Sequence, residues 1–203
     1  EDALLLAMGN HDLDISLEPV VELQSSNIAA YRVHAHLQAA DGSSVHVRRL
    51  EGKHTGIDPA RFDLELFHAA ASAIRRLLGT SADTTPLICP VGISVLSSHK
   101  DLRRIVGMMA ALPALQSGLV IEVPGDALQH EGLASTGAAL LLDAGIRLAV
   151  EGPLPEGQHV EILERFAFEF WSLKGIHIVL SGKSTDTGET GTRLVATHLA
   201  EDH

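Results

Sequence analysis

Three nitrogen bases alternate along one short segment of the chain. In AYRVHAHL, residues 30–37, Arg32, His34 and His36 occupy every second position, and apolar residues occupy the positions around them. Successive side chains of a strand point to opposite faces, so these three would share one surface while the apolar residues face a core. That surface is either the solvated side of a half-buried strand or a face that binds a ligand or a metal ion.

Isolated charges also stand near the ends of three apolar runs. Glu122 belongs to GLVIEV, Glu151 to IRLAVEG and Lys174 to FWSLKGI. If these runs are neighbouring parallel strands, the three charges converge on one rim. A buried charge costs several kcal/mol unless it is paired, so such a cluster is either a compensated network or a functional site.

Alternating strands and helices would position these residues. Two β-rich runs, 14–23 and 28–39, flank the polar QSSN, which predicts a hairpin, and Asp58 followed by Pro59 predicts the start of a helix through Leu78. Beyond it, apolar runs alternate with helical patterns, which indicates a parallel sheet covered by helices. The runs are 86–94, 118–123, 146–152 and 168–176, and the helices are 99–112 with a Ser97 cap, 133–145, 157–167 and 192–203. We also expect a short helix over 2–8 and a mobile loop or lid over 181–191.

A barrel is favoured over an open doubly wound sheet. The open sheet would need a phosphate-binding glycine signature after its first strand, and the sequence contains neither G-x-G-x-x-G nor a P-loop. A barrel carries its chemistry at the C-terminal ends of its strands, which is where the isolated charges lie. We see no domain boundary and expect a single domain over residues 1–203.

The composition excludes several classes of function. The 203 residues carry a net charge of −11, which argues against binding to a nucleic-acid polymer. The single cysteine, Cys89, lies in an apolar setting and is expected to be a buried thiol. The apolar runs are too short to span a bilayer and the start lacks the basic region of a signal peptide. We therefore expect a cytoplasmic protein, or the cytoplasmic part of a larger membrane-anchored one.

Five motifs in order resemble those of the EAL domains, whose active members hydrolyse cyclic di-GMP. SLEPVVELQSSNIAAYRVHAHL, FDLELFHAA, VGISVLSS, LVIEV and FWSLKGI are similar to the family's opening QPIVDL…GYEALLRW, its LD…VL helix, its VNLS, its IEITE and its LKID. The resemblance spans nearly the whole chain. It implies a TIM-like (β/α) barrel whose first strand runs antiparallel to its neighbour, in a chain that ends where the family's last two strands would follow.

The resemblance also implies that most metal ligands of active members are lost. Active EAL enzymes hold two divalent metal ions with the signature glutamate, an asparagine, a second glutamate and paired aspartates, and a lysine stands near the attacking water. Arg32 stands at the signature glutamate and Gly92 at the asparagine. The second glutamate, the paired aspartates and the lysine correspond to Glu122, to Glu151 with Gly152, and to Lys174. We therefore expect no catalytic residue, no metal and no cofactor, and we predict that Arg32 pairs with Glu122 or Glu151.

Three functions are compatible with these residues. The resemblance favours a catalytically inactive signalling domain that acts through protein–protein contacts in a bacterial cyclic di-GMP-related pathway, similar to flagellar-assembly regulators of the TipF kind, as a monomer or a homodimer. The second function is a receptor that binds cyclic di-GMP without hydrolysing it. Its vestigial pocket would comprise Arg32, His36, Asp63, Glu122, Glu151 and Lys174. The third is a metal-dependent hydrolase of another class, because an H-x-H pair also opens the amidohydrolase metal site, although the later strand ends lack further His and Asp ligands.

Overall fold

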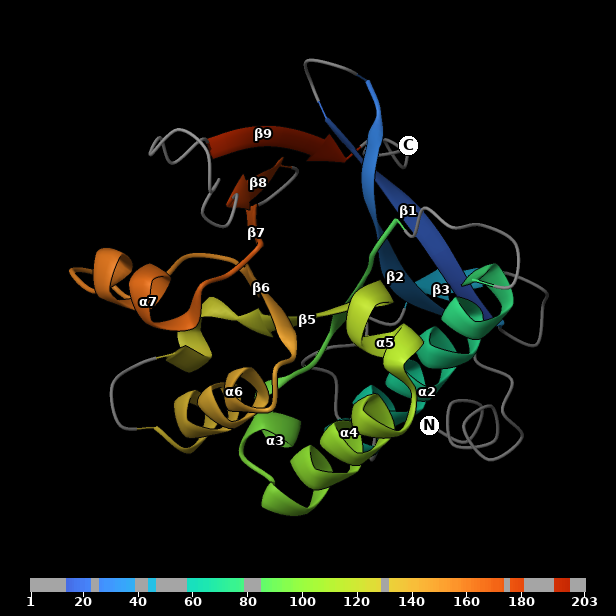
Figure 1. Cartoon of the computed structure of the whole chain (residues 1–203), viewed down its shortest axis with the longest axis horizontal. Helices are drawn as coiled ribbons and strands as arrows, with labels where there is room; N and C mark the ends of the chain where they lie inside the picture. The colour runs from blue at the N-terminus through green and yellow to red at the C-terminus, as the bar shows by residue number, and fades with distance from the viewer. Residues whose placement is uncertain are drawn as a thin grey trace.

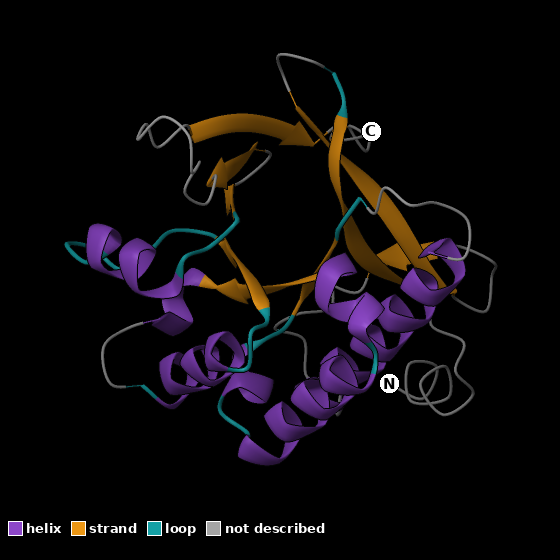
Figure 2. Ribbon diagram, in the orientation of Figure 1, coloured by secondary structure: helices purple, strands orange, loops and turns teal. Residues whose placement is uncertain are grey.

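A curled sheet with helices along its outer side forms the body of the protein (Figures 1 and 2). The computed structural model describes residues 14–22, 26–38, 44–46, 58–78, 85–128, 132–173, 176–180 and 192–197. Lys174, the short helix expected over 2–8 and the loop expected over 181–191 lie outside these residues.

The sheet closes on itself as a barrel, as expected. Its strand order is β1-β9-β8-β7-β6-β5-β4-β2-β3, and β1 also pairs with β2. The strands are β1 (Asp14–Glu22), β2 (Ile28–Gln38), β3 (Ser44–His46), β4 (Leu87–Pro90), β5 (Leu119–Pro124), β6 (Arg147–Glu151), β7 (Phe170–Leu173), β8 (Ile176–Leu180) and β9 (Thr192–Thr197). Strands β2, β4, β5, β6 and β7 run parallel, whereas β1 and β2 form the predicted antiparallel hairpin.

Helices follow the parallel strands and cover their outer side (Figure 2). They are α2 (Pro59–Leu78), α3 (Ile93–Leu96), α4 (His99–Ala111), α5 (Pro113–Gly118), the 3-10 turn η2 (Gly125–Leu128), α6 (Leu133–Asp143) and α7 (His159–Phe166). Asp58 accepts a hydrogen bond from the backbone nitrogen of Ala60 at 3.0 Å at the start of α2. Among the described residues, no helix has the length and apolar character that crossing a bilayer requires.

Two apolar layers hold the barrel together. The larger layer lies between the strands and the helices and includes Val33, Phe67, Met109 and Phe166, all at most 1% exposed. The smaller layer consists of Val20, Ala30, Ile88, Val120, Ala149 and Phe170. Because side chains alternate along each strand, these two sets occupy the two faces of the same sheet. The smaller set therefore fills the inside of the barrel.

Two expectations about the helices are wrong. Residues 192–197 form strand β9 rather than the start of a helix, because they pair with both β8 and β1 and so cover two edges that would otherwise be open. The cap of α4 is Ser98 rather than Ser97. Ser98 has an extended backbone, and its hydroxyl accepts the amide hydrogen of Asp101 at 3.3 Å, which is the geometry that an N-cap requires.

Candidate functional site at the barrel mouth

A polar layer lies directly above the apolar filling of the barrel. Arg32 follows Ala30 by two positions on β2, and side chains two positions apart on a strand share a face. The same offset leads from Val120 to Glu122 on β5, from Ala149 to Glu151 on β6 and from Phe170 to Ser172 on β7. Four strands therefore direct polar side chains to one level inside the barrel, on the side where the parallel strands end.

Arg32 joins two of these strands through both expected carboxylates. Its Nε donates to Oε2 of Glu122 at 3.0 Å, and its Nη2 donates to the same oxygen at 2.5 Å. The same Nη2 donates to Oε1 of Glu151 at 2.7 Å. The prediction that Arg32 pairs with Glu122 or Glu151 is confirmed, and it pairs with both.

Burial makes this network different from a surface ion pair. Arg32 is 8% exposed and Glu122 is 1% exposed, whereas the side chain of Glu151 keeps 29% of its surface. Burial alone would lower the pKa of the Arg32 guanidinium, but the charges and hydrogen bonds of Glu122 and Glu151 outweigh that effect and raise the pKa. The arginine is therefore a fixed positive charge inside the barrel.

Ser172 completes the network, although it was not among the site residues predicted from the sequence. Its hydroxyl donates to Oε1 of Glu122 at 2.5 Å, so both oxygens of this buried carboxylate are hydrogen-bonded. Ser172 is 2% exposed and lies opposite Glu151 in the β6–β7 ladder. A signal was available, because Ser172 follows the apolar Phe170 at the same strand offset that marks the other polar positions.

Asp63 and Gly92 meet beside this layer. The amide of Gly92 donates to Oδ2 of Asp63 at 2.8 Å, which ties α2 to the turn after β4. A Cβ added at Gly92 would lie 2.9 Å from the same oxygen, so a side chain there would have to displace the Asp63 carboxylate. The Asp63 carboxylate therefore occupies the space that a side chain at position 92 would need.

The two histidines of the opening segment contact strand β1. His34 hydrogen-bonds Glu18 through its Nε2 at 2.6 Å, and His36 hydrogen-bonds Ser16 through its Nε2 at 2.7 Å. Glu18 is the ladder partner of Arg32, so it lies at the same level of the barrel. Its role was not foreseen, because only the hairpin register brings it there.

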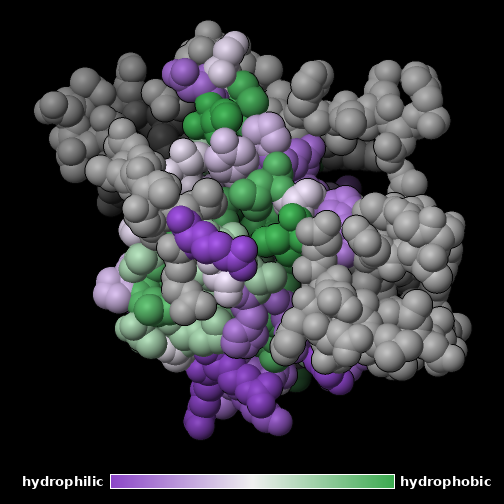
Figure 3. All heavy atoms as spheres, turned by 90° about the vertical axis from the view of Figure 1, so that its right-hand side faces the viewer, coloured by the Kyte–Doolittle hydropathy of each residue, from purple (hydrophilic) through white to green (hydrophobic). Residues whose placement is uncertain are grey.

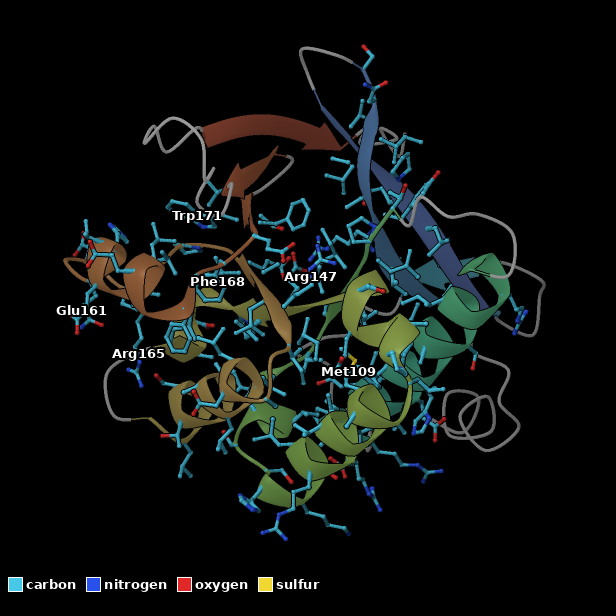
Figure 4. All side chains as sticks on the ribbon, viewed as in Figure 1. Met109, Arg147, Glu161, Arg165, Phe168 and Trp171 are labelled. Carbon is cyan, nitrogen blue, oxygen red and sulfur yellow. The ribbon has the colours of Figure 1, made fainter. Side chains whose placement is uncertain are left out.

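A second arginine clamp lies at the opposite end of β6. Arg147 donates to both carboxylate oxygens of Glu169, at 2.6 Å and 2.5 Å, and to the carbonyl oxygen of Ser117 at 2.6 Å. Figure 4 shows Arg147 within the ring of strands. Since Arg147 precedes Ala149 by two positions on β6, its side chain leaves the strand on the same face as Ala149 and Glu151.

Cys89 offers no reactive thiol. It is 0% exposed on β4, and burial, followed by the negative charges of Asp63 and Glu122, raises the pKa of its thiol. The thiolate that a nucleophile or a metal ligand requires is therefore disfavoured, which confirms the expected buried thiol.

The residues at the mouth do not fit the pair of divalent metal ions that active EAL enzymes hold. A metal ion would need free oxygen ligands, but a guanidinium nitrogen already bridges Glu122 and Glu151. The adjacent Gly92 has no ligand atom in a side chain. Within the described parts of the chain, no group of three or more His, Cys, Asp or Glu side chains could hold a metal ion.

Solved structures resemble this fold, although no protein-family profile and no curated protein matches the chain. LapD of Vibrio cholerae, an S helix-GGDEF-EAL chain bound to cyclic di-GMP, superposes with a TM-score of 0.68 at 15% identity. The match covers 85% of this chain and 41% of the LapD chain, so this chain spans less than half of that relative.

Two other structures agree. The phosphodiesterase PaMucR in complex with cyclic di-GMP has a TM-score of 0.68 at 13% identity, with 85% of this chain and 71% of that chain covered. The FimX EAL domain of Pseudomonas aeruginosa bound to cyclic di-GMP has a TM-score of 0.66 at 16% identity, with 86% and 70% covered. The chain has the fold of an EAL domain.

Proposed function

We propose that this chain is a catalytically inactive EAL-like domain that acts through protein–protein contacts in a cyclic di-GMP-related pathway. The observation that carries the proposal is the Arg32 guanidinium, which lies 2.5 Å from Glu122 and 2.7 Å from Glu151. It occupies the carboxylates that a hydrolytic metal centre would need. The proposal treats residues 1–203 as one domain, working in the cytoplasm or as the cytoplasmic part of a membrane-anchored protein.

A hydrolysis assay tests the inactivity. The purified chain is incubated with cyclic di-GMP and either Mg²⁺ or Mn²⁺, and the nucleotides are separated by chromatography. We expect no linear product above the buffer blank. Hydrolysis that disappears in the Glu122→Gln variant would show that the domain is an enzyme, and hydrolysis that persists in this variant would point to a contaminant.

The surface offers apolar side chains for protein contacts. Leu133 at the start of α6 is 75% exposed and Val160 on α7 is 70% exposed, more than the other large hydrophobic residues described. On another face, shown in Figure 3, hydrophilic side chains gather at the lower end of the molecule. A specific partner should be captured by the wild-type chain and lost with Leu133→Glu or Val160→Glu. Ala110 on α4 is also exposed, so Ala110→Glu serves as the control and should leave capture of the partner unchanged. Sedimentation measures whether the partner is a second copy of this chain.

The second candidate is a receptor that binds cyclic di-GMP without hydrolysing it. One observation supports this second candidate: the LapD and FimX structures of this fold hold cyclic di-GMP. Against it, Arg32 is already paired, and the described side chains at its level include the carboxylates of Glu18, Glu122 and Glu151. Calorimetry decides between the two: heat and thermal stabilisation with cyclic di-GMP would favour the receptor, and neither at millimolar nucleotide would favour the protein-contact module.

A further inference from the structure

Three cations gather at the start of α4, although the whole chain carries a net charge of −11. Lys100, Arg103 and Arg104 are all exposed. Arg104 contacts Asp101 at 3.5 Å, and the Asp101 carboxylate also accepts the hydroxyl of the helix cap Ser98 at 2.6 Å. Within the described parts of the chain, neither Lys100 nor Arg103 forms an ion pair with a carboxylate. The start of α4 therefore presents positive charge to the solvent. α4 lies at the lower end of the molecule in Figure 1, where hydrophilic side chains gather in Figure 3.

The neighbouring helix α6 exposes apolar side chains beside its contact with α3 and α4. A Cβ added at Gly137 would lie 1.9 Å from the backbone oxygen of Leu96 and 3.0 Å from Leu102, so the helices are in close contact there. Leu133 and Leu140 stand four positions before and three positions after Gly137. On a helix with 3.6 residues per turn, both side chains point within about 60° of the direction of Gly137. They are 75% and 40% exposed, so they form an apolar border along this contact.

The cations and the apolar border form one amphipathic surface. Leu102, the α4 residue at the contact, lies next to Arg103 and two positions after Lys100. One turn of a helix rises about 5.4 Å, so the cations lie within about one turn of the contact. The exposed face of α6 ends at Asp143, so the positive charge is confined to the α4 side. We call the exposed side chains of Lys100, Arg103, Arg104, Leu133 and Leu140 the α4–α6 surface.

We propose that the α4–α6 surface docks an acidic amphipathic helix of a partner protein. The apolar face of that helix covers Leu133 and Leu140, which stand about two turns apart, a spacing that the anchors of a docked helix match. Its Asp and Glu side chains face Lys100 and Arg103, which have no carboxylate partner among the described residues. This inference rests on the proposed function, because it gives the chemistry of the partner that a protein-contact module binds.

The net negative charge of the chain does not prevent this docking. At physiological ionic strength, charges more than about 8 Å apart are largely screened, so the side chains at the contact decide the interaction. Complementary charges at the rim of an interface also speed association and make it depend on salt. Salt dependence is therefore a direct readout of the role of the α4 cations.

An anionic lipid surface fits the α4–α6 surface less well than an acidic protein does. Recognition of anionic lipids typically takes about four to eight neighbouring Lys or Arg side chains, whereas α4 supplies three. Helices that lie in the membrane interface also carry Trp or Phe on their apolar face. Among the described residues, the exposed large hydrophobic side chains are Ile, Leu and Val, without an aromatic residue.

Fluorescence anisotropy with a synthetic peptide tests the proposal on the wild-type chain. The probe is a labelled amphipathic helix with leucine along one face and glutamate on the flanking positions, and a second peptide has lysine in place of every glutamate. We expect saturable binding of the glutamate peptide, weakened about threefold or more at high salt, and no binding of the lysine peptide. Equal binding of the two peptides, or no saturable binding of the glutamate peptide, would overturn the proposal.

Two double variants locate the binding. Lys100→Glu combined with Arg103→Glu places like charges opposite the peptide and should weaken binding about tenfold or more. Arg61→Glu combined with Arg76→Glu changes the net charge by the same amount at two exposed positions of α2. This control should change the affinity by less than about twofold, because an exposed charge outside the contact is screened. Equal weakening by the two double variants would contradict the assignment to α4.

Other occupants of the surface give different results. We expect no pelleting of the wild-type chain with vesicles of phosphatidylcholine and phosphatidylserine, and no self-association in sedimentation, that Lys100→Glu combined with Arg103→Glu removes. Vesicle binding with that dependence would assign the surface to a membrane, and self-association with that dependence would assign it to a second copy; either would overturn the proposal. The hydrolysis assay of the proposed function uses neither these variants nor the peptides, so the two proposals can fail separately.

Discussion

Replacing Arg32 by methionine should destabilise the protein far more than a surface substitution would. Methionine keeps part of the side-chain volume but removes three hydrogen bonds to carboxylates. It also leaves two carboxylate oxygens no more than about 5 Å apart, where unit charges repel each other by at least about 3 kcal/mol at an effective dielectric constant of about 20. Removing one partner of a buried ion pair costs about 3–5 kcal/mol, so we expect a loss of unfolding free energy of this size.

Arg147→Met is the matched control for this experiment. Arg147 also binds a carboxylate of the barrel with two hydrogen bonds, but the side chains of Arg147 and Glu169 are 31% and 33% exposed. Solvent screens such a pair, and we expect a loss of about 1 kcal/mol. Urea denaturation followed by circular dichroism at pH 7.5 measures both variants. A loss below about 1 kcal/mol for Arg32→Met, or equal losses for the two variants, would refute the reasoning.

Three further predictions concern other sites. Gly137→Ala should lower the free energy of unfolding by more than about 3 kcal/mol, because the added Cβ would lie 1.9 Å from a backbone oxygen of α3. Gly107→Ala has open space around the added Cβ and should raise the free energy of unfolding by up to about 1 kcal/mol. Urea denaturation compares the two, and equal effects would contradict the packing. Gly92→Ala should lower the free energy of unfolding by about 1 kcal/mol, because the added Cβ displaces the hydrogen-bonded Asp63 carboxylate. The loss should be smaller in an Asp63→Ala background, and equal losses in both backgrounds would contradict this explanation. Cys89 should react with a thiol reagent at pH 8 only after unfolding. Because burial raises the pKa of its thiol, the free energy of unfolding should fall as the pH rises above the usual thiol pKa of about 8.5. The Cys89→Ala variant should not show this fall. Fast labelling of the folded chain would contradict the burial of this thiol.

The central site could be inferred from the sequence because each of its charged residues interrupts an apolar strand. Glu122 and Glu151 each stand near the end of an apolar strand, which predicts that they share one rim, whereas the prediction that Arg32 pairs with them rests on the family resemblance. Ser172 and Glu18 escaped notice because a serine or a glutamate in a strand is ordinary. Only the pairing of β7 with β6 and of β1 with β2 gives these two their positions.

The C-terminal part of the barrel depends on contacts that sequence periodicity does not contain. The segment TRLVAT is short and can be read as a helix or as a strand. It becomes β9 because β8 on one side and β1 on the other offer unpaired backbone groups. β1 is remote in sequence, so this outcome follows from closure of the barrel rather than from local propensity.

A crystal structure of the wild-type chain grown in MnCl₂ would test the central claim most directly, because manganese is located by its anomalous scattering. The account predicts a guanidinium of Arg32 between Glu122 and Glu151, with no anomalous peak at these carboxylates. An anomalous peak between the two glutamates, with Arg32 turned away from both, would contradict it.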